Sequence, residues 1–382
     1  MSKALARNDM GNLVHKAASG ALRHSCAFLT VTRGHVEWGE PSTVVSAYPL
    51  TASSAIWDEA RKRIGAGMVV VASARRASRS QRVPTMIYVF TDESLIVISR
   101  PTPSERFSAT YVAHSMGRVP MEPIAYHATL ERPFGRSRIT RTVMGLVDDA
   151  QREMLNMTAA ASFSAMPQKY LMGADRTTAE EIAKRPFNAF IGSLFVGTTN
   201  SRGQVPQFGQ LAQLPMQPHI DYMRSLAAQF SGTTGAPLSS LGVVSDNPSS
   251  AEAIAASIEP LIIDAKNLNR DNGCALRNVA YMALAVLHGT DFATERDAGL
   301  NVNARFMSPA YPSVVSQSDA MLKQVQALPK IAASDVALET LGYTDEQMQR
   351  INSDYKKAQA NQAVLSLLTP KEDGDGDTAQ PA

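Results

Sequence analysis

Residues 249–288, SSAEAIAASIEPLIIDAKNLNRDNGCALRNVAYMALAVLH, decide the fold. Glu252 follows Ser249 by three residues, a spacing typical of a capping box, in which each side chain bonds a free backbone N–H at a helix start. Pro260 removes a backbone donor and clashes with the preceding turn, so we expect a kink there. Apolar residues recur at helical spacing over about 38 residues, or about 57 Å at 1.5 Å per residue. They are Ile254, Ile258, Leu261, Ala265, Leu268, Leu276, Val279, Ala283 and Leu287. A helix this long indicates a piece of a large assembly.

A first shorter helical pattern lies upstream and is expected to end before Pro167. Its apolar residues recur at three- and four-residue steps, which places them on one face. They are Ile139, Val143, Leu146, Ala150, Met154 and Met157. The other face carries Arg141, Asp148, Asp149, Arg152 and Asn156. Asp148 and Arg152 are spaced for an i,i+4 ion pair.

A second shorter pattern covers residues 218–230, with Ile220, Met223, Ala227 and Phe230 on one side. Between the two patterns, residues 167–217 hold short apolar runs separated by glycines, which predicts a small excursion that contains β structure. Residues 231–248 are rich in Gly, Thr and Pro, and predict a loop that leads into the long helix.

The first 130 residues predict a short helix followed by β structure. The expected strands are rich in β-branched residues and cover 28–33, 43–48, 68–74, 85–91, 94–99 and 107–113. Asp92 and Glu93 separate two of them at the spacing of a hairpin. Basic residues between the strands form a candidate patch, either a solvated rim or a contact for nucleic acid or an acidic partner. They are Arg61, Lys62, Arg63, Arg75, Arg76, Arg79 and Arg82.

Composition sets further limits. The 382 residues are 44% hydrophobic, which is ordinary for a folded soluble protein, and allow two or three modules. Cys26 and Cys274 are isolated, which excludes a disulfide framework and a cysteine zinc site and suits a reducing cytosol. The N-terminus lacks a signal-peptide core, and the most apolar stretch, 280–287, is too short to cross a bilayer. The near-neutral charge, 37 basic against 35 acidic residues, is not that of a protein that grips DNA by many phosphate contacts.

No catalytic signature is present in the sequence. Residues 232–242 contain glycines but lack the lysine of a phosphate-binding loop, and residues 135–138 do not complete a nucleophile elbow. The seven histidines form no zinc motif. Asp373, Asp375 and Asp377 resemble the start of a calcium loop but lack its closing glutamate, so a solvated acidic tail is the better interpretation. We therefore expect a structural protein without cofactor or metal, and not an enzyme.

The order of these pieces resembles the portal proteins of tailed double-stranded DNA bacteriophages, in the branch found in many long-tailed phages. Four segments between residues 1 and 368 carry the likeness. They are GRVP (117–120) with RPFGRSRITR (132–141) and VDDA (147–150); PQKYLMGAD (167–175); the stretch 230–250, which contains GAPLSSLGVVSDNPSS, with 251–254; and ETLGYTDEQMQR (339–350). Such portals usually carry a further N-terminal segment before the part that resembles residues 8–34, so the wing is expected to be shortened here.

The resemblance implies an α+β, ring-forming portal fold with the following parts. They are a β-rich wing (1–135), stem helix 1 (136–166), a clip (167–212), stem helix 2 (213–231), a tunnel-loop region (232–250), a long kinked helix with more wing (251–333), and crown-like C-terminal helices with a disordered tail (334–382). Within these parts, the helices are expected at about 137–161 and 217–230. In a ring, part of the long helix would face a neighbouring subunit and look too hydrophobic for a monomer.

The resemblance also implies the functional residues and partners. The tunnel loop would face DNA with Ser245, Asp246, Asn247, Ser249 and Ser250. The clip would dock partners through Arg185, Phe187, Phe190 and Arg202. The tunnel-loop residues hold no positive charge, which suits DNA that must slide. The partners would be other copies in a twelve-subunit ring, double-stranded DNA, the terminase large subunit, a head-completion adaptor, and the major capsid and scaffolding proteins, with no membrane.

The implied function is the channel at one capsid vertex for DNA packaging and ejection, located in the virion and, during assembly, in the host cytoplasm. Two alternatives stay open. Another head component, such as a head-completion or minor capsid protein, would lack the paired stem helices that bracket a clip. A nucleic-acid hydrolase would need clustered acidic or histidine ligands, which the sequence does not show.

Overall fold

The computed structural model describes residues 7–75, 82–165, 250–298, 302–310 and 314–368. Between 169 and 243 it describes 169–173, 176–177, 180, 199, 203, 205, 207–210, 212 and 215–243. The chain divides into two compact units, Met1–Arg305 and Phe306–Ala382. Their elements are helices and antiparallel sheets, which agrees with the predicted α+β class.

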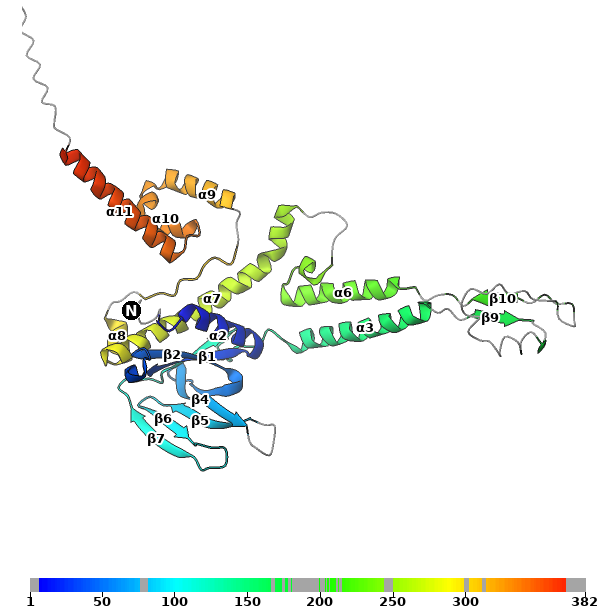
Figure 1. The fold of residues 1–382 in the computed structure, drawn as a ribbon, viewed down its shortest axis with the longest axis horizontal. Coiled ribbons are helices and arrows are strands. Elements are labelled where there is room, and N and C mark those ends of the chain that lie inside the picture. The colour runs from blue at the N-terminus through cyan, green and yellow to red at the C-terminus, as the bar shows by residue number, and fades with distance from the viewer. Residues whose placement is uncertain are drawn as a thin grey trace, which may run out of the picture. The chain divides into compact units, whose positions relative to one another are not determined.

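Two antiparallel sheets follow helix α2 (Met10–His24) in the first unit (Figure 1). The three-stranded sheet has the order β2-β1-β8, made by Thr43–Pro49, Cys26–Arg33 and Met121–Ala125. The five-stranded sheet runs from β3 to β7 in chain order: Ser53–Asp58, Arg63–Arg75, Arg82–Phe90, Ser94–Ser99 and Ser108–Ala113. The six predicted strands and the hairpin between β5 and β6 are confirmed. Strands β3 and β8 and the 3-10 turns Val36–Trp38 and Leu50–Ala52 were not predicted.

Strand β1 separates two hydrophobic clusters because successive side chains point to opposite faces of a sheet. Ala27, Leu29 and Val31 face a cluster completed by α2 and the C-terminal part of the long helix. Cys26 and Phe28 face the other cluster, which includes residues of the five-stranded sheet. Gly67 of β4 lies where a Cβ would collide with the Met121 sulfur, so glycine permits this close approach of the two sheets. The first unit is therefore layered, with helices, the small sheet and the large sheet in sequence.

Helices α3 (Arg141–Ala165) and α6 (Gln217–Thr234) lie side by side and antiparallel (Figure 1). They fall on the two predicted helical patterns, and α3 ends before Pro167 as predicted. Between them the structure describes two antiparallel paired strands, β9 (Lys169–Met172) and β10 (Gln207–Gln210), with Gln207 opposite Met172. The expected β-containing excursion between two helices is thus present in the described residues. The turn Leu238–Leu241 follows α6.

The predicted apolar face of α3 is wrong in part. Met154 is exposed, and its expected place is taken by Glu153, which is buried together with Val143 and Ala160. The polar pairing also differs, because Arg152 pairs with Asp149 at 3.0 Å and not with Asp148. Sequence periodicity favoured Met154 because a carboxylate is normally excluded from a helix–helix contact.

The long helix α7 covers Ala251–His288, and its predicted length of 38 residues is confirmed. Pro260 lies inside it, and Figure 1 shows that the helix changes direction along its length. The N-cap is Ser250, whose side chain accepts a hydrogen bond from the Ala253 amide at 3.1 Å. Because Ser250 is the cap, the helix starts one residue later than the capping-box spacing indicated. The predicted cap, Ser249, lies outside the described residues. The short helix α8 (Phe292–Asp297) packs against α7.

The predicted basic patch is not a single surface among its described members. Arg63 begins β4 and Arg75 ends it, so they lie about 40 Å apart at about 3.3 Å per residue. Near the first end, Arg61 and Arg63 share the Asp92 carboxylate at 3.0 and 3.5 Å, and Lys62 pairs with Glu59 at 3.1 Å. Arg76 and Arg79 lie outside the described residues.

The second unit is helical in its described residues. It holds α9 (Val314–Ala327), the 3-10 turn Pro329–Ala333, α10 (Asp335–Thr340) and α11 (Asp345–Leu368). Asn352 of α11 donates to the Asp335 carboxylate of α10 at 2.8 Å. Met321, Ala337 and Met348 are its buried apolar residues. Helices are present from residue 334 onward as expected, but Asp345–Leu368 forms one helix of 24 residues and not two short ones.

Candidate functional site

A hydrogen bond between a buried carboxylate and a partly buried histidine joins the two antiparallel helices. Glu153 of α3 meets the Nδ1 atom of His219 of α6 at 2.5 Å and accepts a bond from Asn156 at 3.2 Å. The hydrogen bond from His219 holds the pKa of Glu153 below its usual range. A buried carboxylate that is paired in this way fixes the register of the two helices, because sliding either helix would leave it without a partner.

A second polar cluster forms where this helix pair meets α7 and the small sheet. Asp264 of α7 accepts from the Tyr126 hydroxyl at 2.9 Å and contacts His127 at 3.0 Å. Arg138, just before α3, lies 3.3 Å from Asp264 and donates to the Thr234 carbonyl at the end of α6 at 2.7 Å. Burial and the bond to Asp264 raise the pKa of Tyr126 to about 12. One carboxylate thus connects α7 to the strand exit and to both helices. We call Tyr126, His127, Arg138, Thr234 and Asp264 the junction.

The segment RPFGRSR (132–138), part of the family resemblance, is explained by this junction. Phe134 packs edge-on against Phe28 and Trp57 in the core between the sheets. Gly135 has φ of 70°, and a Cβ there would collide with the Tyr126 carbonyl, so only glycine fits. The Ser137 hydroxyl donates to the Arg23 carbonyl at 2.7 Å, near the end of α2. The segment therefore anchors the start of α3 on the sheets and on α2.

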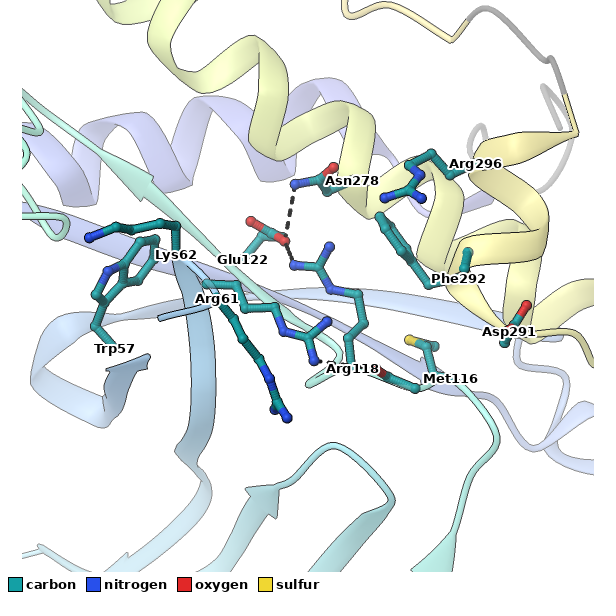
Figure 2. A pocket seen from close by; sticks show the side chains of 13 residues that line it. Trp57, Arg61, Lys62, Met116, Arg118, Glu122, Asn278, Asp291, Phe292 and Arg296 are labelled. Atoms are coloured by element: carbon teal, nitrogen blue, oxygen red, sulfur yellow. Dashed lines mark hydrogen bonds and ion pairs between the residues drawn. The ribbon is translucent and has the colours of Figure 1, made fainter. Parts of the chain in front are cut away.

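A polar cavity of about 430 Å³ lies between the β3–β4 turn, residues 116–118 and helices α7 and α8 (Figure 2). Arg118 makes a hydrogen-bonded ion pair with Glu122 of β8, and both side chains are more than nine-tenths buried. Asn278 of α7 donates to the same carboxylate at 3.3 Å, and the Arg118 guanidinium lies 4.3 Å from the centre of the Phe292 ring. Figure 2 shows Arg118 reaching from the 116–118 segment to Glu122.

Burial dominates the electrostatics of this pair. It raises the pKa of Glu122 to about 7, and it lowers the pKa of Arg118 from its ordinary value. Both directions show that loss of solvent outweighs the mutual attraction of the two groups. The cations on the rim of the cavity are paired with carboxylates: Arg61 with Asp92, and Arg296 with Asp297 at 2.9 Å. The cavity is thus walled by ion pairs between side chains of this chain, although the buried Nε atoms of Arg63 and Arg118 make no hydrogen bond within the described residues, and we assign the cavity a structural role.

The predicted site residues fall mostly outside the described part of the chain. Of the five tunnel-loop residues only Ser250 is described, and it caps α7. Ser245, Asp246, Asn247 and Ser249 lie outside, as do the predicted docking residues Arg185, Phe187, Phe190 and Arg202. Their roles stay predictions.

Sequence reasoning missed the buried polar residues Glu122 and Glu153 and the partly exposed Asp264. Glu153 and Asp264 lie on predicted helices, where each reads as one more solvent-facing charge. The sequence signal that could have found them is their position beside predicted apolar faces. Glu153 is seven residues, or two helical turns, after Leu146, and Asp264 directly precedes Ala265. Glu122 lay in a strand that was not predicted.

Two kinds of site are not seen in the described residues. Within that part of the chain, no three His, Cys, Asp or Glu side chains are grouped to hold a metal ion. Among the described helices, none has a stretch long and apolar enough for a bilayer crossing.

Comparison with known proteins supports the predicted resemblance. No family model matches the chain. The portal protein of Mycobacterium phage D29 is 26% identical over 246 residues, which cover 62% of this chain and 49% of the relative. The portal protein of Mycobacterium phage L5 is 24% identical over 243 residues, which cover 63% of this chain and 49% of the relative. The chain therefore spans about half the length of the curated relatives it matches. The similarity to bacteriophage portal proteins is confirmed, and the alternative of another head component is not favoured.

Proposed function

We propose that this chain is a portal subunit, one of the copies that form a ring-shaped channel at a single vertex of a phage capsid. The similarity to two mycobacteriophage portal proteins carries the proposal. The order of elements is consistent with it: a β-rich part, the α3–α6 pair that brackets the β9–β10 strand pair, and the 38-residue α7. In this role the protein is a structural component and not an enzyme.

Within the ring, α3 and α6 would form the stem, the segment between them the clip, and the loop before α7 the tunnel loop. Double-stranded DNA would pass through the channel during packaging and ejection. The clip would dock the terminase large subunit and later a head-completion adaptor, while the wing would contact the capsid and scaffolding proteins. The near-neutral charge of the chain supports a channel that does not hold what passes through it. The proposed location is the capsid vertex of the virion, after assembly in the host cytoplasm.

Two features of the described stem support a role in a larger assembly. Helix α3 is 25 residues long and packs on α6 along one side, which leaves the rest of its surface open. Several large apolar side chains are exposed there, among them Met144, Leu155 and Phe163 at 47%, 70% and 67%. Exposed apolar surface of this kind marks an interaction site.

Negative-stain electron microscopy of the purified full chain tests the proposal. We expect rings with a central hole wide enough for duplex DNA, because the duplex has to pass through it. Mass photometry of the same sample would give the number of subunits, for which twelve is the expectation. A sample that stays monomeric under all assembly conditions would contradict the proposal.

A further inference from the structure

Helix α3 carries an exposed ridge that its contact with α6 does not use. Met144, Asp148, Gln151 and Leu155 follow one another at four-, three- and four-residue steps, so they share one face of the helix. All four are exposed, with Met144 at 47% and Leu155 at 70%. We call these four residues the ridge. The ridge has an apolar residue at each end and polar residues between them.

An apolar groove lies on another side of the same helix pair. It has a volume of about 580 Å³ and runs between α3, α6 and the turn that follows α6. Met154 and Met157 line it from α3, and Ile220, Met223 and Ala227 line it from α6. Three of these are methionines, whose flexible thioethers adapt to an incoming side chain. Arg224 is the charged residue of the lining, and its side chain is 61% exposed.

The ridge and the groove lie at the same level along the helix pair. The contact between Glu153 and His219 sets the register, and the two helices run antiparallel. Each step forward on α6 is therefore one step back on α3, at 1.5 Å per residue. Arg224 is five residues after His219, and Asp148 is five residues before Glu153, so the two charges are level. Leu155 follows Met154, which itself lines the groove.

We propose that the ridge of one copy packs into the groove of the next copy, with Asp148 of one paired to Arg224 of the other. This interface rests on the proposed portal ring. Neighbours in a ring are related by rotation, which uses two different patches of each subunit and preserves height along the axis. A ring whose axis follows the stem needs two complementary patches at one level, and the ridge and groove meet that need in polarity and charge. Among the described residues, the ion pair of Arg224 is a long one, 3.9 Å to Asp221.

A charge-swap experiment on the full chain tests the interface. Asp148→Arg and Arg224→Asp each place like charges opposite one another, and each should lower the fraction of rings at fixed concentration about tenfold or more. The double variant restores opposite charges and should recover rings to within about threefold of the unchanged protein. Mass photometry and negative-stain images give the ring fraction, and far-UV circular dichroism confirms that each variant is folded.

Asp149→Arg is the matched control, because Asp149 is the next residue but pairs with Arg152 away from the ridge. It should leave the ring fraction unchanged. Single variants that form rings as well as the unchanged protein would overturn the interface, and so would a double variant that fails to recover. If the unchanged protein forms no rings, both the proposed function and the interface are wrong. If rings form but substitutions at Asp148 and Arg224 do not change their fraction, only the interface is wrong.

Discussion

The two halves of α7 have the same apolar periodicity but different surroundings. In the C-terminal half Val279 and Met282 are fully buried against α2 and the small sheet. In the N-terminal half Ile254 and Ile263 are 49% and 51% exposed. The core of the first unit thus ends about midway along the helix, and the remaining apolar face is available to a partner. The expectation that this helix is too hydrophobic for a monomer fits its N-terminal half only.

Breaking the ion pair beside the buried half should have the largest effect. At about pH 8, where Glu122 is ionised, Arg118→Met leaves its carboxylate buried without its cation, which should cost about 3–5 kcal/mol of unfolding free energy. Urea denaturation measures the loss. Arg270→Met, on an exposed part of α7, is the control and should stay within about 0.5 kcal/mol.

The double variant Arg118→Met/Glu122→Leu sharpens this test. Replacing both partners with apolar groups removes the desolvation cost, so much of the lost stability should return. A double variant that is less stable than Arg118→Met would show that the pair is not held in a dry environment.

Truncating one apolar side chain in each half of α7 should give the next largest difference in unfolding free energy between the halves. Met282→Ala removes a fully buried side chain and should lower the unfolding free energy by about 2–5 kcal/mol. Ile254→Ala, in the exposed half, should change it by no more than about 0.5 kcal/mol in dilute, unassembled protein. Thermal or urea unfolding of the two variants side by side measures both values. Equal losses would mean that the N-terminal half is covered within the monomer.

The unfolding free energy should also depend on pH. Burial raises the pKa of Glu122 from 4.5 to about 7, so between these values the folded state holds a proton that the unfolded state releases. The unfolding free energy of the unchanged protein, measured relative to that of Glu122→Gln, is therefore highest below pH 4.5. It falls as the pH rises toward 7. The slope should be at most about 1.4 kcal/mol per pH unit. Unfolding free energies of both proteins at several pH values between 4.5 and 7.5 measure it. A difference that stays flat, or that grows with pH, would contradict the burial of this carboxylate.

The sequence predicted the regular elements well because their signals are local. Six strands, the two stem-like helices and the full length of α7 follow from side-chain period and from proline and glycine positions. It predicted Asp148–Arg152 where the structure has Asp149–Arg152, since both spacings satisfy a helix and only packing decides between them.

The candidate sites were predictable only where the family resemblance reached. The partners of Asp264 lie more than 120 residues away in sequence, and Glu122 meets Asn278 across 156 residues. No local pattern reports such contacts, because they arise from the stacking of elements. The same limit applies to β8, whose sequence MEPIA combines a charge and a proline and reads as a loop, although β1 and α7 bury it.

The smallest predicted effect concerns the junction, at the boundary between the two halves of α7. Asp264→Asn keeps the size of the side chain but removes the charge that faces Arg138, His127 and the Tyr126 hydroxyl. We expect a loss of about 1 kcal/mol, since the group is partly exposed and asparagine can still accept one of the bonds. The effect should be local, with faster amide hydrogen exchange at the end of α6, where Arg138 holds the Thr234 carbonyl. Asp271→Asn, a surface carboxylate beside Arg270, is the matched control and should leave exchange in α6 unchanged. Uniform exchange changes throughout the first unit would mean that Asp264 stabilises the whole core, and that the boundary midway along α7 does not separate two regions.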